Sequence, residues 1–181
     1  MEKLRLIAIE THVADSRTCC LHPASTTHRQ LTPQELIDCA NECNIITVLD
    51  PNPRNPMQLS GLTAMKPNRS EAFAMAGVPV TAQKGDAAND DALKEVAAIL
   101  QKKWQVKHLL ISLAAQGMAL YNADGSCTII PTRAREVYDV SGAGDTVVAA
   151  ASLALAAGSD ARPSSRWQIP TLAFEDVVFS A

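Results

Sequence analysis

The stretch "LTPQELIDCANECNIITVLD", Leu31 to Asp50, changes from a helical pattern to a strand pattern within a few residues. Thr32 is a good N-cap, Pro33 suits the first helical position, and Glu35 completes a capping box. The run "IITVLD" is short, apolar and β-branched, which is typical of a buried strand that ends at Asp50. A helix followed directly by a buried strand is the unit from which parallel sheets are built.

The same alternation of strand and helix extends along most of the chain. "KLRLIAIE" and "LTAM" predict short strands, and Asn68 or Ser70 begins a helix that Gly77 ends. Asp90 begins an amphipathic helix, "KHLLISL" predicts a strand, and "GMALYNADGSCTII" predicts a β-hairpin. "REVYDV" is a further extended piece, and the last helix runs from Gly142 to Gly158. This order predicts an α/β domain with a mainly parallel sheet, helices on both faces and one antiparallel hairpin.

The composition excludes several classes of function. The chain has 181 residues, of which 47% are hydrophobic and 19% charged, as expected for a soluble globular domain. The net charge of -3 and the aromatic content of 4% argue against nucleic acid as a partner. The longest apolar run, Val147 to Ala157, is shorter than the roughly 20 residues of a membrane span. We therefore expect no membrane partner.

The five cysteines predict a cytoplasmic protein with reduced thiols, because their number is odd and no secretory signal precedes them. A metal site is one alternative, since two cysteines stand four residues apart on the first predicted helix. The other is a set of small, buried or half-buried thiols, and the absence of any C-x-x-C pair favours it. The residues of the conceivable metal site are Cys19, Cys20, His22, His28, Cys39 and Cys43.

Polar segments follow several of the predicted strands. In parallel sheets, ligands bind beyond the carboxyl ends of the strands, so we expect these segments to form one site. They are Asp50, Lys66–Glu71, Ser112–Gly117 and Asp139–Asp145.

The segment "DVSGAGDT" places a carboxylate directly behind a Gly-Ala-Gly turn at the start of a helix. Such a turn exposes backbone N–H groups, and the helix dipole adds partial positive charge, so the turn is suited to an anion. An ionised Asp145 could accept the proton of a hydroxyl that attacks a phosphoryl group. From the turn alone a second interpretation remains open, in which Asp145 only stabilises the helix start. No G-x-x-x-x-G-K-[ST] loop is present, and Val147 replaces the third glycine of the dinucleotide fingerprint.

Three motifs in order resemble those of the PfkB/ribokinase family of carbohydrate kinases. They are "NRSE" (Asn68–Glu71), "SLAAQG" (Ser112–Gly117) and "DVSGAGDT" (Asp139–Thr146). Within that family the chain is most similar to the kinase domain of the heptose-7-phosphate kinase / ADP-heptose synthase group, roughly from Leu31 to Gly158. The resemblance implies a three-layer, ribokinase-like (Rossmann-like) fold, present here in incomplete form.

The resemblance also implies ATP and Mg²⁺ as cofactors and assigns roles to residues. Asp145 would be the catalytic base, with an anion hole made by the amides of Gly142, Ala143 and Gly144. Glu71 would act on magnesium by way of a water molecule, although it is also a common type of first-turn helix acid. Ser112, which could equally be only a polar strand end, would flank the nucleotide with Gly117. The residues along the ATP phosphates would be Asn68, Arg69, Ser70 and Glu71.

The departures from the family define the expected organisation. Residues 1–30 match it poorly, residues 31–158 resemble the ATP-side part of the kinase domain, and residues 159–181 form a divergent tail. The substrate half with its Gly-Gly motif is not visible, so we expect apolar edges that could support a homo-oligomer. The predicted function is ATP-dependent phosphorylation of a sugar or sugar phosphate. The alternative is a non-catalytic nucleotide-binding module or a degenerate fragment of such a kinase.

Overall fold

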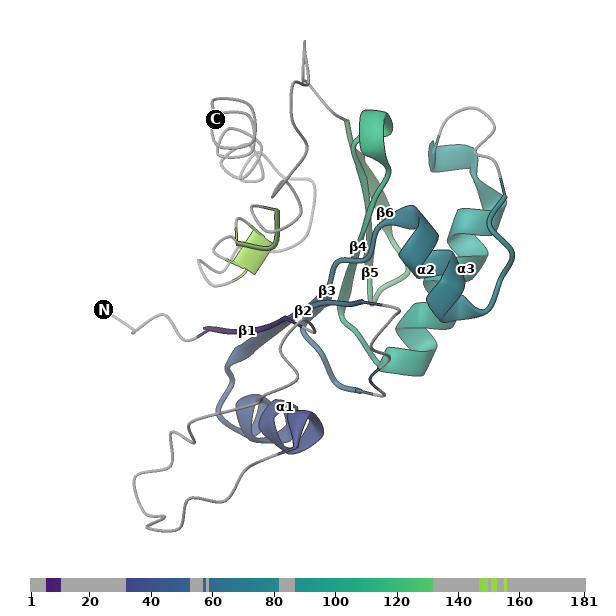
Figure 1. The fold of residues 1–181 in the computed structure, drawn as a ribbon. Helices are drawn as coiled ribbons and strands as arrows, with labels where there is room; N and C mark the ends of the chain where they lie inside the picture. The colour runs from purple at the N-terminus through teal and green to yellow at the C-terminus, as the bar shows by residue number, and fades with distance from the viewer. Residues whose placement is uncertain are drawn as a thin grey trace, which may run out of the picture.

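The computed structural model describes residues 6–10, 32–52, 57, 59–81, 87–131, 147–149, 151–152 and 155. Within these residues it contains one sheet of six strands, in the order β1-β2-β3-β4-β5-β6 (Figure 1). The strands are β1 (Leu6–Glu10), β2 (Ile46–Asp50), β3 (Ala64–Met65), β4 (His108–Ser112), β5 (Met118–Asn122) and β6 (Cys127–Ile130). The helices are α1 (Pro33–Glu42), α2 (Arg69–Ala76) and α3 (Asp91–Trp104), with short 3₁₀ turns η1 (Ala87–Asn89) and η2 (Ala114–Gln116).

The sheet is parallel from β1 to β4 and antiparallel from β4 to β6. Leu49 of β2 lies beside Met65 of β3, and Met65 lies beside Leu109 of β4. The hairpin turns at Asp124 and Gly125, where the Ser126 N–H donates to the Asp124 carboxylate at 2.9 Å and Gly125 has φ 82°. The predicted mainly parallel sheet with one hairpin is therefore confirmed.

Local capping explains where α1 begins. The Thr32 hydroxyl accepts from the Glu35 N–H at 3.3 Å, and the Thr32 N–H donates to the Glu35 carboxylate at 2.9 Å. Pro33 occupies the first turn, where its missing N–H costs no helical hydrogen bond. Ile37 and Ala40 are buried against the sheet. The predicted capping box is confirmed.

The long helix α3 begins at Asp90, whose Oδ1 accepts from the Leu93 N–H at 3.0 Å. Its apolar residues recur at the helical period and are fully buried, so one face of the helix packs on the sheet. These residues are Leu93, Val96, Ala97 and Leu100.

Alternating residues of the strands face two different layers. Leu109 and Tyr121 belong to the main core, which also includes side chains from α1, α2 and α3. Leu110 and Leu120 belong to a second cluster on the opposite face, together with Ala151. Figure 1 shows α2 and α3 on one side of the sheet and the short helical piece around residues 147–152 on the other. Helices thus cover both faces, as predicted.

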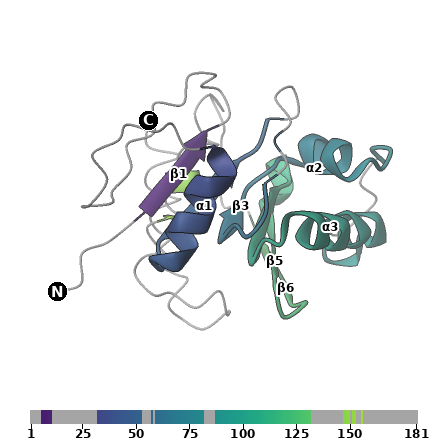
Figure 2. The same ribbon diagram turned by 90° about the horizontal axis from the view of Figure 1, so that it is seen from below.

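The helices of the main layer are spread along the sheet. Viewed from below, α1 lies beside β1, whereas α2 and α3 lie side by side at the end formed by β5 and β6 (Figure 2). Lys103, near the end of α3, donates to the Met75 carbonyl near the end of α2 at 3.2 Å. The two helices therefore run parallel to each other, and both begin at the carboxyl edge of the parallel strands. In the described part of the chain, no helix has the length and apolarity needed to cross a membrane.

Candidate functional site

Two of the polar segments predicted to form a site are neighbours at the carboxyl edge of the sheet. Asn68 and Ser112 form an isolated parallel bridge, and the Ser112 N–H donates to the Pro67 carbonyl at 3.1 Å. The chain between them contributes α2 and α3, so this contact depends on the fold and not on proximity in sequence. The structure therefore brings the start of "NRSE" against the start of "SLAAQG".

The start of α2 has a complete capping box. The Asn68 carboxamide oxygen accepts from the Glu71 N–H at 2.9 Å, and the Asn68 N–H donates to Glu71 Oε2 at 2.8 Å. The N–H groups of Arg69 and Ser70 belong to the first helical turn, where no intrahelical acceptor exists for them. Together with the helix dipole, these groups suit the start of α2 to an anion. The same geometry commits one Glu71 oxygen to the helix start.

The Arg69 side chain turns from the start of α2 toward α3. Its Nη2 lies 2.8 Å from Asp90 Oδ2, and the two side chains are 15% and 9% exposed. The guanidinium also stacks over the Phe73 ring, 4.6 Å from the ring centre. The Arg69 side chain therefore links the starts of two helices. Its backbone N–H is one of the donors at the start of α2 that suit an anion. No local sequence pattern predicts this pairing.

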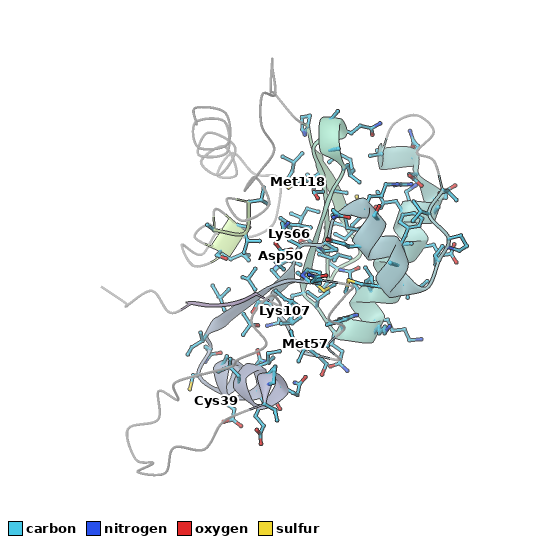
Figure 3. All side chains as sticks on the ribbon, viewed as in Figure 1. Cys39, Asp50, Met57, Lys66, Lys107 and Met118 are labelled. Atoms are coloured by element: carbon cyan, nitrogen blue, oxygen red, sulfur yellow. The ribbon has the colours of Figure 1, made fainter. Side chains whose placement is uncertain are left out.

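A second ion pair lies at the carboxyl ends of β2 and β3. Lys66 Nζ lies 3.3 Å from Asp50 Oδ2, with side-chain exposures of 9% and 25%. Because Leu49 is in register with Met65, the next residues on each strand are neighbours on the opposite face of the sheet. Figure 3 shows Lys66 and Asp50 together on the side of the sheet toward residues 147–152. Sequence analysis predicts both residues at the ends of strands, but it does not predict the ion pair between them.

The segment from Ser112 to Gly117 forms a compact turn between β4 and β5. The Leu113 N–H donates to the Gly117 carbonyl at 2.8 Å, and η2 lies between them. Gly117 has φ 88° and ψ -125°, a conformation that is essentially restricted to glycine. The glycine of this motif is therefore required by the backbone, whatever it binds.

The Gly-Ala-Gly-Asp turn lies outside the described residues. This applies to Gly142, Ala143, Gly144 and Asp145, whose roles remain predictions. The residues that follow, 147–149 and 151–152, are helical, and Val147, Ala151 and Ser152 are buried. A helix thus follows the turn, and it packs on the sheet face that carries the Asp50–Lys66 pair.

The cysteine metal site has no support within the described part of the chain. Cys39, Cys43 and Cys127 are exposed and form no disulfide, so the expectation of buried or half-buried thiols is wrong for these three. No group of three metal-ligating side chains is found among the described residues. The other residues of that hypothetical site, Cys19, Cys20, His22 and His28, lie outside the described ranges.

Comparison with known proteins found relatives in sequence. The chain is 37% identical over 139 residues to the "Bifunctional protein HldE" of Trichlorobacter lovleyi, which covers 75% of this chain and 27% of that protein. It thus spans about a quarter of the length of the curated relatives it matches.

Solved structures share the fold at lower sequence identity. Phosphofructokinase-2 from Escherichia coli, in complex with substrates and products, aligns with a TM-score of 0.63 and 20% identity, over 81% of this chain and 45% of that chain. Arabidopsis thaliana ribokinase, complexed with ribose and ATP, aligns with a TM-score of 0.62 and 21% identity, over 80% of this chain and 44% of that chain. Residues 19–166 match the family described as pfkB family carbohydrate kinase. This match covers most of the chain, and the protein belongs to the pfkB family of carbohydrate kinases.

Proposed function

We propose that residues 31–158 form the ATP-side part of a kinase that transfers the γ-phosphoryl group of ATP to a hydroxyl of a sugar or sugar phosphate. The observation that carries this proposal is the bridge between Asn68 and Ser112. It joins two segments far apart in sequence at the edge where α/β proteins bind ligands. Residues 1–30 and 159–181 are proposed to lie outside this ATP-side part.

The residues at the start of α2 fit the phosphates of ATP with magnesium. The N–H groups of Arg69 and Ser70 can donate to phosphate oxygens, and Asn68 fixes the helix start that presents them. Glu71 uses Oε2 in the capping box, which leaves Oε1 for a water molecule on Mg²⁺. When bound, the ion neutralises charge on the phosphates. Ser112 and Gly117 are proposed to flank the nucleotide.

Asp145 is proposed as the base that accepts the proton of the acceptor hydroxyl. The amides of Gly142, Ala143 and Gly144 would donate to the transferring phosphoryl group as an anion hole. The helical residues 147–149 and 151–152, which follow the turn in sequence, support this proposal, because a helix that began at the turn would add its dipole to the amides.

The proposed acceptor is a heptose 7-phosphate or a similar sugar phosphate. The support is the likeness to relatives named "Bifunctional protein HldE", together with the resemblance of residues 31–158 to the heptose-7-phosphate kinase group. The proposed partners are ATP, the sugar phosphate and a second copy of the chain, in the cytoplasm.

A second candidate function is nucleotide binding without phosphoryl transfer. The observation in its favour is that Glu71 and the Arg69 side chain both have structural partners, in the capping box and in Asp90. Calorimetric titration with ATP and Mg²⁺, run beside a turnover assay, separates the two functions. Binding without turnover on any acceptor would favour the binding module.

The kinase proposal predicts that Asp145→Asn abolishes turnover. The assay follows ADP release with a panel of sugar phosphates that includes heptose 7-phosphate. Loss of a general base typically costs about 10²–10⁴-fold in rate. The matched control is Asp91→Asn, which removes an exposed acid from the first turn of α3 and should leave turnover unchanged. Turnover that survives Asp145→Asn would contradict the assigned base.

A further inference from the structure

The Arg69 side chain is held in one place by partners on several parts of the chain. Its Nη2 lies 2.8 Å from Asp90 Oδ2 and donates to the Thr81 carbonyl at 3.4 Å. Its guanidinium lies over the Phe73 ring, 4.6 Å from the ring centre. Asp90 is itself fixed, because its Oδ1 caps α3 by accepting from the Leu93 N–H at 3.0 Å. The first residue of α2 is therefore tied to the start of α3.

The stability of the fold does not account for this ion pair. Arg69 Nε and Nη1 are buried and have no hydrogen-bond partner among the described residues. The side chains of Arg69 and Asp90 are only 15% and 9% exposed. Buried donors without partners are costly, and a buried ion pair is often no more stabilising than apolar side chains of similar volume. What the pair does provide is a fixed position for the start of α2.

We propose that Arg69 and Asp90 are positioning residues, which hold the start of α2 in the orientation that binds the phosphates of the nucleotide. This inference rests on the proposed function, in which N–H groups at the start of α2 donate to phosphate oxygens. It gives a role to Asp90, which none of the three sequence motifs contains. The Arg69 side chain acts through the backbone of its own residue, because a fixed side chain limits the directions in which that N–H can point. A site that is ordered in advance loses less conformational entropy on binding and therefore binds more tightly.

A second contact joins the other ends of the same two helices, which lie side by side (Figure 2). Lys103 Nζ donates to the Met75 carbonyl at 3.2 Å. This bond also ties α2 to α3, but it lies at the end of α2 that is far from the N–H groups of the first turn. Its loss should loosen the helix pair without releasing the start of α2. Lys103→Met is therefore the matched control for a variant that breaks the contact between the helix starts.

The test compares ligands that differ in their phosphates, in a variant that keeps its stability. Arg69→Met/Asp90→Asn removes both charges and retains the cap of α3, since asparagine caps a helix as well as aspartate does. Calorimetry on the full chain measures the Kd of ATP, ADP and adenosine, each with Mg²⁺. We expect the Kd of ATP and ADP to rise about 3- to 10-fold, the cost of ordering one residue on binding, and that of adenosine to change less than about twofold. Lys103→Met should change none of the three.

The outcomes separate this inference from the proposed function. A folded double variant that binds ATP and ADP as tightly as the unsubstituted chain would show that the ion pair has only a structural role. That result, or an equal loss of affinity for all three ligands, would overturn the inference and leave the proposed function intact. If the unsubstituted chain binds ATP no more tightly than adenosine, the proposed phosphate contacts are absent, and the proposed function fails together with the inference.

Arg69→Lys keeps the test decisive if the double variant does not fold. Lysine keeps a counter-charge for Asp90, but it lacks the planar group that stacks on Phe73 while it pairs with a carboxylate. The Kd of ATP should then rise at least about twofold, with no change in the Kd of adenosine. An ATP Kd equal to that of the unsubstituted chain would overturn the inference.

Discussion

At the scale of a single residue, Tyr121 has a buried hydroxyl with only a weak partner. The residue is 6% exposed, and its hydroxyl makes no hydrogen bond to a nitrogen or oxygen atom of the described residues; its polar neighbour is the Cys127 thiol. Burial raises the pKa of Tyr121 above its ordinary value, and the nearby Cys127 thiol and Asp90 carboxylate raise it further. Tyr121 and Cys127 are cross-strand neighbours in the β5–β6 hairpin. The phenol therefore remains protonated in the folded state.

Tyr121→Phe should make the protein more resistant to alkaline pH. The unfolded chain loses the Tyr121 proton above about pH 10, whereas the folded chain keeps it, so the free energy of unfolding falls as the pH rises past that value. The phenylalanine variant lacks this loss. At pH 7 the free energy of unfolding of the variant should equal or exceed that of the unsubstituted protein by up to about 1 kcal/mol, because it is costly to bury a hydroxyl whose polar neighbour is a weakly accepting thiol. Urea unfolding at about pH 7 and pH 11 measures both effects. An identical pH dependence in the two proteins would refute this account.

At the scale of elements, the Arg69–Asp90 pair links the starts of α2 and α3. Asp90 uses Oδ1 to cap α3 and Oδ2 to pair with Arg69. Asparagine is as good an N-cap as aspartate, so Asp90→Asn removes the charge and retains the cap. We expect a loss of about 3 kcal/mol in the free energy of unfolding, because a largely buried Arg69 guanidinium is left without a counter-charge.

Denaturant unfolding followed by circular dichroism measures this loss. Asp91→Asn, at the adjacent and exposed position, is the matched control and should cost less than about 0.5 kcal/mol. The double variant Arg69→Met/Asp90→Asn should recover most of the stability lost in Asp90→Asn. An additive loss in the double variant would show that the two side chains act independently.

The elements could be predicted from the sequence because their determinants are local. Both capping boxes depend on residues three positions apart, Thr32 with Glu35 and Asn68 with Glu71. The Arg69–Asp90 and Asp50–Lys66 ion pairs could not be predicted, because each joins residues that are distant in sequence. The Asp50–Lys66 pair requires the register of β2 on β3, and no local pattern specifies a register of a two-residue strand. The candidate site was predictable as a set of strand ends but not as a set of contacts.

At the scale of the whole molecule, elements from both faces of the sheet lie near the carboxyl edge of its parallel strands, where the nucleotide is proposed to bind. α2 and α3 both begin at this edge, and the residues around 147–152 cover the other face. A nucleotide bound there would contact parts of both layers. Binding should therefore stabilise the complete fold and not one element alone.

ATP with Mg²⁺ should raise the thermal unfolding temperature of the full chain. A ligand that binds only the folded state at about 100 times its Kd adds about 2.7 kcal/mol to the free energy of unfolding. Differential scanning calorimetry at increasing ATP concentration measures the shift, and adenosine should give a smaller one at equal concentration. An unfolding temperature that does not change with up to millimolar ATP would contradict nucleotide binding at this edge.

The strand order of the sheet has a consequence for biosynthesis. Each strand from β2 to β6 pairs with the strand that immediately precedes it in sequence. Every pairing can therefore form as soon as the later strand has left the ribosome, without waiting for a segment made afterwards. Short-range pairing of this kind keeps loop-closure entropy low and favours rapid folding. During translation the described sheet can grow in one direction, from the edge strand β1 toward β6, so that its growing edge is always the strand made last.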